Sequence, residues 1–254
     1  MVKLNPRRID NKNHNTPVLY DWEIDNYAHA VLKDYKPHLL ESPGAINFRH
    51  FLESYLGASI EYHDIYNDDP KHPILAMTVY GQGDIKIFDR ENKRICRIDV
   101  PKRTVVIDNS VMEFGREGLA LFSSLHEAGH ITMHWDVYSA MLEESIETGD
   151  SIIPIVFCRR ENIEKRITIT GNKIKLQRTA EEWREHQADY FAAALAMPNA
   201  TFKPFIHSLM RENGCFKGSI TIGRDNDLDI LTNDIMPEAI SEVYGVSKEE
   251  RRAY

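Results

Sequence analysis

The apolar positions near the start of the chain recur every three or four residues, as they do on one face of an amphipathic helix. One such stretch runs from about Trp22 to Lys36, and a second from about Ile46 to Tyr55. Gly57 follows the second stretch and is expected to cap it, because glycine tolerates the left-handed backbone at a helix end. The first 20 residues are polar and predict a loose N-terminal arm.

The apolar period then changes to two, which is typical of β-strands. Short runs of this kind occupy residues 59–62, 75–80, 85–87, 94–98 and 104–107. They predict a small antiparallel sheet. Because predicted helices flank this block on both sides, the expected fold class is α+β.

Helical spacing returns after the predicted sheet, and this stretch carries the most specific chemical signal in the chain. Its apolar positions are Leu119, Phe122, Leu125, Gly129 and Met133. Ser110–Glu113 has the pattern of a capping box and predicts the start of the helix. We expect the helix to continue past His134 to about Tyr138.

Within this predicted helix, residues 126–130 read H-E-x-x-H. Positions i and i+4 share one helix face, so His126 and His130 can reach one zinc ion. Glu127 then lies beside the open coordination position, where it can act as a general base. The alternative is a core helix that carries two hydrogen-bonded histidines.

A second helical block supplies a candidate third ligand. The pattern predicts that Thr179 caps this helix, with Glu182 completing a capping box, and that Met197-Pro198 ends it. Glu185 and Asp189 lie one turn apart on it. We expect Glu185 to bind the metal and Asp189 to accept a hydrogen bond from a ligand histidine. The alternative for both is a solvated acidic face.

The two blocks together resemble the ImmA/IrrE metallopeptidases, which pair H-E-x-x-H with a later E-x-x-A-[ND]-x-F-A-x-x-L-x-M-P. Here the later block runs from Glu185 to Pro198 and matches at each specified position. His134 also matches a histidine often seen in that family. The resemblance extends roughly from Val105 to Pro198. It departs from the family in the long interval between His130 and Glu185, which an inserted hairpin would explain.

The resemblance implies a zincin-like fold, with a small sheet over the metal helix and flanking N- and C-terminal helices. It also implies a gluzincin-like zinc peptidase that cleaves a helix-turn-helix repressor. The expected units are the arm (1–20), the peptidase domain (21–198) and a C-terminal helical region (199–254). Residues 139–180 are expected to form an insertion or flap, with a hairpin at 167–176. The strand at 104–107 or its neighbour is a candidate for binding substrate by strand addition.

The sequence leaves open the identity of the oxyanion donor and the role of the C-terminal helices. The oxyanion donor is one of Tyr190, Tyr138, His134 and His186, and His134 is alternatively a partner of a ligand histidine. The end of the chain around Gly245 resembles a helix-turn-helix. We expect instead a helical pair that packs on the core.

The composition limits the remaining possibilities. The net charge of −8 argues against direct nucleic-acid binding, and the membrane is excluded as a partner because no long apolar run exists. Three scattered cysteines and the lack of a signal-like N-terminus predict a reducing, cytoplasmic location. Cys158 could approach the metal, although a structural thiol is favoured. The rival function is a non-catalytic zinc protein that acts on a repressor or on DNA by binding; a degradative protease is disfavoured.

Overall fold

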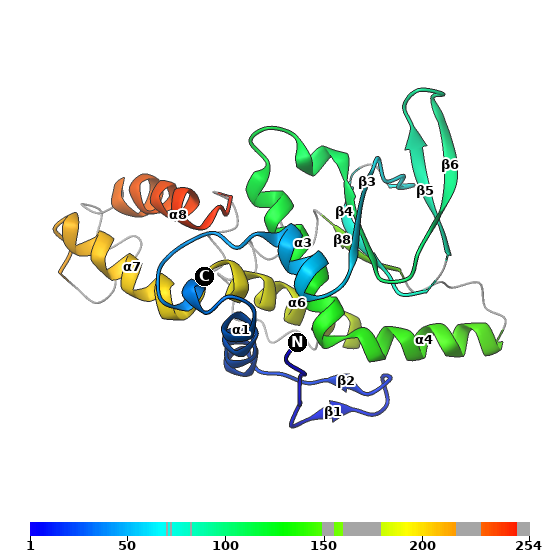
Figure 1. Cartoon of the computed structure of the whole chain (residues 1–254), viewed down its shortest axis with the longest axis horizontal. Helices are drawn as coiled ribbons and strands as arrows, with labels where there is room; N and C mark the ends of the chain where they lie inside the picture. The colour runs from blue at the N-terminus through cyan, green and yellow to red at the C-terminus, as the bar shows by residue number, and fades with distance from the viewer. Residues whose placement is uncertain are drawn as a thin grey trace.

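The computed structural model describes residues 1–69, 71, 73–81, 83–148, 155–159, 179–216 and 230–247, with residues 155–159 described by their backbone. It is a mixed α+β structure, as expected (Figure 1). The hairpin predicted at 167–176, the short helix expected after residue 247 and the side chain of Cys158 lie outside the described residues. Over the part of the chain described, no helix is long and apolar enough to cross a membrane.

Among the residues described, the main sheet has four strands in the order β3-β7-β4-β8. They span Ser59–His63 (β3), Thr104–Asp108 (β7), Ile74–Val79 (β4) and Ile155–Arg159 (β8). The expectation of a purely antiparallel sheet is wrong, because β3 pairs with β7 in parallel. β7 also has a neighbour on each side, so it has no free edge for a substrate strand. β8 comes from the expected insertion and pairs with β4.

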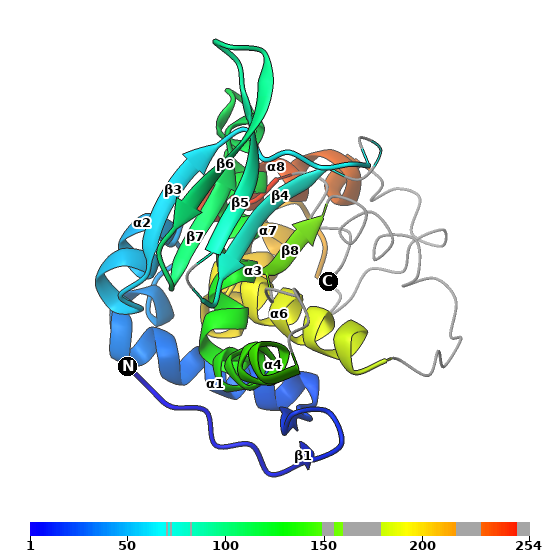
Figure 2. The same cartoon turned by 90° about the vertical axis from the view of Figure 1, so that its right-hand side faces the viewer.

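β5 (Gly83–Asp89) and β6 (Arg94–Val100) form a separate antiparallel hairpin. It covers the face of the main sheet opposite to α3 (Figure 2). Alternation along β4 explains how both faces are buried: Ala76 joins the main core, whereas Met77 and Val79 pack with Ile85 of the hairpin. The strand therefore lacks a solvent-facing side and reads as a continuous apolar run.

Two helices of 17 residues each, α3 (Glu117–Met133) and α6 (Ala180–Ala196), pack against each other beneath the sheet. Their close approach depends on Gly129, since a Cβ added there would lie 2.9 Å from the Cα atom of Ala188. The capping box predicted for α6 is present, with Thr179 and Glu182 bonded reciprocally.

Both predicted ends of the α3 helix are wrong. Ser110 lies in a separate 3-10 turn, η3 (Asn109–Met112), which Asp108 caps, and α3 begins after Arg116. The helix ends at Met133, because His134 has φ −122° and ψ 7° and so leaves the helical conformation. A new helix, α4 (Trp135–Thr148), begins immediately after it.

The expected N-terminal arm is more ordered than its composition suggests. β1 (Ile9–Asp10) and β2 (Thr16–Pro17) pair as a short hairpin, and Thr16 is buried. Its hydroxyl accepts a hydrogen bond from the buried guanidinium of Arg184 at 3.1 Å, so the hairpin is held against α6. The expectation of a loose arm is corrected for residues 9–17.

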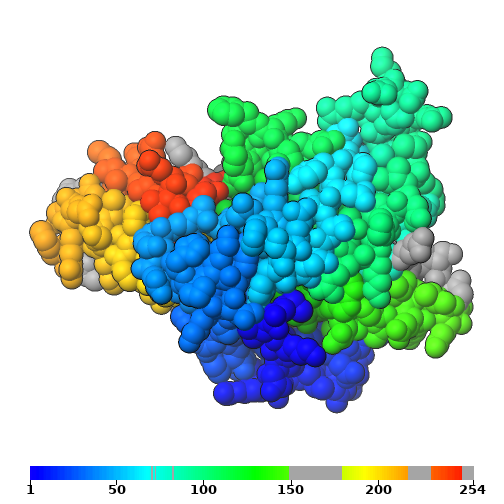
Figure 3. All heavy atoms as spheres, in the orientation of Figure 1, coloured from blue at the N-terminus to red at the C-terminus, as the bar shows by residue number. Residues whose placement is uncertain are grey.

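The helices predicted from about Trp22 to Lys36 and from about Ile46 to Tyr55 are present as α1 (Asp21–Tyr35) and as α2 (Phe48–His50), which continues as the π-turn η2 (Phe51–Tyr55). The structure adds two short turns that the sequence pattern did not predict, η1 (Pro37–Leu40) and η5 (Leu231–Ile235). The C-terminal region contains α7 (Asn199–Glu212) and α8 (Met236–Tyr244). Gly57 has a positive φ, as expected of a cap. Ile240 and Tyr244 of α8 join the main core, so this helix packs on the body of the protein. Figure 3 shows α7 and α8 at one end of the molecule and the β5–β6 hairpin at the other.

Candidate metal centre

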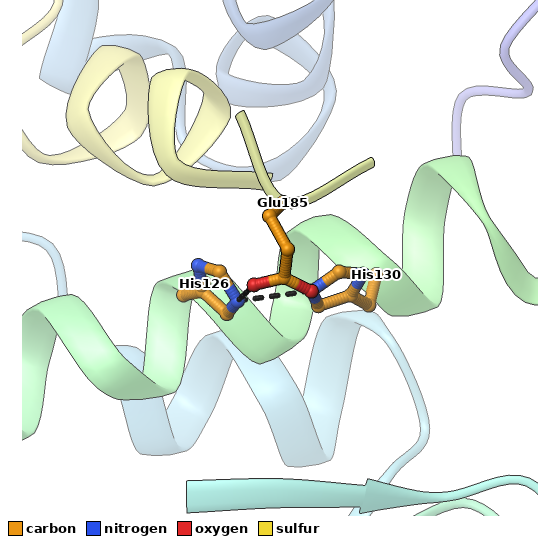
Figure 4. Close-up of side chains that lie close together, drawn as sticks. All are labelled: His126, His130 and Glu185. Carbon is orange, nitrogen blue, oxygen red and sulfur yellow. Dashed lines mark hydrogen bonds and ion pairs between the residues drawn. The ribbon is translucent and has the colours of Figure 1, made fainter. Parts of the chain in front are cut away.

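Three predicted ligands meet between α3 and α6. The Nε2 atoms of His126 and His130 are 2.9 Å apart on one face of α3. Glu185 reaches across from α6, and its two oxygens lie 3.4 Å from His126 Nε2 and 3.3 Å from His130 Nε2 (Figure 4). One ligand atom from each residue fits within a 4.8 Å cluster, so these three groups could hold a metal ion.

The remaining ring nitrogen of each histidine is bound by another side chain. His126 Nδ1 lies 2.7 Å from Asp189 Oδ1, as the one-turn spacing on α6 predicted. A carboxylate oxygen accepts, so Nδ1 carries the proton and Nε2 is left as a lone pair facing the cluster. His130 Nδ1 lies 3.1 Å from His134 Nδ1, which places His134 behind a candidate ligand, as expected.

Burial and the neighbouring side chains shift the pKa values of the histidines and of Glu185. Desolvation lowers the pKa of His130 to about 4, against the opposing effect of Glu185, and it lowers the pKa of His134 well below its usual value. Burial alone would raise the pKa of Glu185, but His130 and His126 hold it well below the usual range. Near neutral pH the His130 ring is therefore neutral and Glu185 is ionised, the forms in which these side chains bind metals.

Glu127 is fully buried beside the ligands and is oriented by the sheet. The hydroxyl of Thr78, on β4, donates a hydrogen bond to Glu127 Oε2 at 2.5 Å. Because β4 lies between β7 and β8, the sheet fixes this hydroxyl from both sides. Glu127 is thus placed next to the cluster without belonging to the group that could hold the ion.

Two tyrosines lie close to this site. Tyr138 packs edge-on against the His130 ring with centroids 5.8 Å apart, and its hydroxyl accepts a hydrogen bond from Arg184 Nε. Tyr80, fully buried, packs on Tyr138 with the ring centroids 4.8 Å apart and the rings tilted by 38°. Burial, followed by the neighbouring Tyr138 and the carboxylates of Glu127 and Glu185, raises the pKa of Tyr80 well above its usual value. Both phenols are therefore protonated at neutral pH.

The structure separates the four candidates for oxyanion donor. The Tyr190 hydroxyl donates to Asp25 of α1, and His186 pairs with Asp21 at the start of the same helix. His134 uses both ring nitrogens in bonds to His130 and Gln187. Of the four, Tyr138 is the one that packs on a ligand while its hydroxyl accepts from Arg184, which leaves its own proton for donation.

Sequence reasoning missed four residues that shape this site: Thr78, Tyr80, Arg184 and Gln187. The sequence could have indicated Arg184 and Gln187, because they stand three residues apart in the same buried stripe of α6 as Phe191. Polar side chains in such a stripe need partners inside the protein. Thr78 and Tyr80 had no comparable signal, since their roles depend on which helix covers the strand.

Comparisons with protein-family models, with curated proteins and with solved structures give no match.

Proposed function

We propose that this chain is a zinc-dependent endopeptidase of the gluzincin type, with a zincin-like arrangement of sheet and metal helix. The observation that carries the proposal is the meeting of His126, His130 and Glu185 beside a buried Glu127. Two imidazoles and one carboxylate are the ligand set of many catalytic zinc sites, which keep a further position open. A purely structural site would have no use for Glu127 next to it.

The donor atoms fit zinc by their chemistry. Zinc binds imidazole nitrogen and carboxylate oxygen. Here the two imidazoles come from α3 and the carboxylate comes from α6. Bound there, zinc would polarise a peptide carbonyl and lower the pKa of a water molecule.

Glu127 would transfer the proton, and Tyr138 would stabilise the negative charge that develops on the oxyanion. Glu127 would accept the proton of the attacking water and deliver it to the leaving amine. Thr78 holds one oxygen of that carboxylate and so restricts its orientation. Tyr138 would donate a hydrogen bond to the oxyanion, because its hydroxyl already accepts from Arg184 and its pKa is raised by burial.

The proposed substrate is a cytoplasmic helix-turn-helix repressor, cut at one or a few positions. This part of the proposal is supported by the likeness of the two sequence blocks to the ImmA/IrrE metallopeptidases. The net charge of −8 is compatible with binding a basic, DNA-binding protein.

The test uses a repressor encoded next to this chain, incubated with purified wild-type protein and with Glu127→Gln. Mass spectrometry of fragments formed in ¹⁸O-labelled water would identify a hydrolysed bond by its labelled carboxyl terminus. We expect cleavage by the wild type and a rate lower by roughly two to four orders of magnitude for Glu127→Gln. If neither protein cuts the repressor and both relieve repression equally in cells, the protein acts by binding, and the peptidase proposal fails.

A further inference from the structure

A line of hydrogen bonds runs from the candidate ligand His130 to the N-terminal hairpin. It passes through the side chains of His134 and Gln187 and ends on the backbone carbonyl of Pro17. We propose that this relay sets the tautomer of His130, which makes Gln187 a positioning residue for the metal centre. The inference rests on the metal site of the proposed function, but it does not depend on peptidase activity.

The N-terminal hairpin fixes the orientation of the Gln187 amide. Its Nε2 lies 2.8 Å from the carbonyl oxygen of Pro17, in β2. A carbonyl oxygen can only accept a hydrogen bond, so the group facing it must be the amide NH₂. The Gln187 carbonyl oxygen therefore faces the other way, towards His134. The N-terminal hairpin, and not the metal site, decides which end of this amide His134 meets.

The orientation of the Gln187 amide determines which ring nitrogens of His134 and His130 carry a proton. His134 Nε2 lies 3.1 Å from Gln187 Oε1 and must donate to it, because an amide oxygen only accepts. A neutral imidazole has one ring proton, so His134 Nδ1 is left as an acceptor. His130 Nδ1, at 3.1 Å from it, then donates. The lone pair of His130 Nε2 is consequently directed at His126 and Glu185.

The two ligand histidines are thus oriented by different means. His126 donates directly to the carboxylate of Asp189, whereas His130 donates into a relay of uncharged groups. With both Nδ1 atoms protonated, two Nε2 lone pairs and a carboxylate converge on one point, which favours a cation there. His134, Gln187 and both ligand histidines are fully buried, so water does not replace a lost partner in the relay.

The residues of the relay come from separate segments of the chain. His134 is the single residue between α3 and α4, and its own N–H still bonds to the carbonyl of His130 at 2.9 Å. Gln187 stands on α6 two residues after Glu185 and faces the hairpin instead of the cluster. Three separate segments must therefore be assembled before His130 is oriented.

The experiment measures ring tautomers by ¹⁵N NMR of histidine-labelled protein near pH 7.5, without metal and with zinc. In the wild type we expect the Nδ1–H form of His130 and the Nε2–H form of His134. Gln187→Met keeps the volume but removes the acceptor, so His134 should no longer hold one tautomer. Zinc affinity should fall by about 10- to 100-fold, as is usual when the partner of a ligand is lost. Ser124→Ala, a buried change on α3, is the control and should alter neither quantity.

A second pair of variants separates the relay from simple packing. His134→Asn keeps an amide oxygen that can accept from His130 Nδ1, whereas His134→Ala does not. Asparagine should therefore recover part of the zinc affinity that alanine loses. Equal affinities in the two variants, or an unchanged His134 tautomer in Gln187→Met, would overturn the relay. If the wild type shows the expected tautomers without metal but binds no zinc, the relay stands and the proposed zinc site fails.

Discussion

Thr78 and Glu127 are joined by a hydrogen bond of 2.5 Å between the central sheet and α3. The bond links a strand residue to the carboxylate that the sequence marks as the general base, although 49 positions separate them in the chain. It fixes Glu127 from the side of the sheet, while α3 fixes its backbone. Removing this hydroxyl should consequently change catalysis more than metal binding.

Thr78→Val tests this expectation, since it keeps the shape of the side chain and removes the donor. The hydrolysis rate should fall by about tenfold, the effect of one hydrogen bond to a charged group, with zinc content unchanged. Cleavage of the repressor would be measured at equal zinc loading. Thr104→Val is the matched control, because Thr104 is equally buried in the neighbouring strand β7. A loss of rate as large in Thr104→Val would show that the effect comes from the sheet in general.

Gly129 is expected to be indispensable for the packing of α3 on α6. A Cβ added there would meet the Ala188 Cα at 2.9 Å and its carbonyl oxygen at 3.1 Å, both of which belong to the backbone. Gly129→Ala should lower the free energy of unfolding by about 1–3 kcal/mol and weaken zinc binding, because Glu185 would move away from the histidines. Denaturant unfolding measures the first effect.

Gly44→Ala provides the control for that substitution, as a Cβ at Gly44 would have no neighbour within 4 Å. Its free energy of unfolding should stay within about 0.5 kcal/mol of the wild type. If Gly129→Ala is as stable as Gly44→Ala and binds zinc normally, the two helices have room to separate without cost.

The sequence predicted most of the helices and the residues of the candidate metal cluster because these depend on local spacing. The period of α1, the capping box at Thr179 and Glu182 and the i, i+4 pair of His126 and His130 are all encoded within a few residues. The same holds for Asp189, whose one-turn distance from Glu185 on α6 places it behind His126.

What the sequence could not predict depends on contacts between distant segments. The parallel pairing of β3 with β7 joins strands that lie on either side of β4 and the β5–β6 hairpin in the chain. His134 leaves the helical conformation without a proline or glycine to announce it, in a position where its ring bonds to His130 and Gln187. Residues 9–17 look like a polar arm until Arg184 and Gln187 of α6 supply their partners.

The stability of the metal-free protein should fall as the pH is lowered from about 6.5 to about 4. His130 has a pKa of about 4 in the folded protein, against an ordinary value of 6.5, so the unfolded chain binds more protons in this window. The stability that His130 contributes by remaining neutral in the folded protein is fully present above pH 6.5 and is lost as the pH falls towards 4. The expected change from His130 is roughly 3 kcal/mol, and Glu185, whose pKa is also depressed, adds a loss of the same sign at the acid end.

Urea unfolding of metal-free protein between pH 4 and pH 7.5 would measure this dependence. His130→Gln removes one titrating ring and should reduce the slope of the curve between pH 4.5 and 6.5, leaving the part that comes from His134, whose pKa is also lowered by burial. A wild-type curve that runs parallel to that of His130→Gln would mean that His130 titrates alike in the folded and unfolded states.

The central claim, that His126, His130 and Glu185 hold one zinc ion, is tested most directly by the metal content of purified protein. Elemental analysis after equilibration with zinc and gel filtration should find about one zinc per chain in the wild type. His130→Ala and Glu185→Ala should each lose most of it, whereas Glu127→Gln should retain it, because Glu127 is not a ligand. Full retention of zinc by Glu185→Ala, or its absence from a folded wild type, would contradict the account.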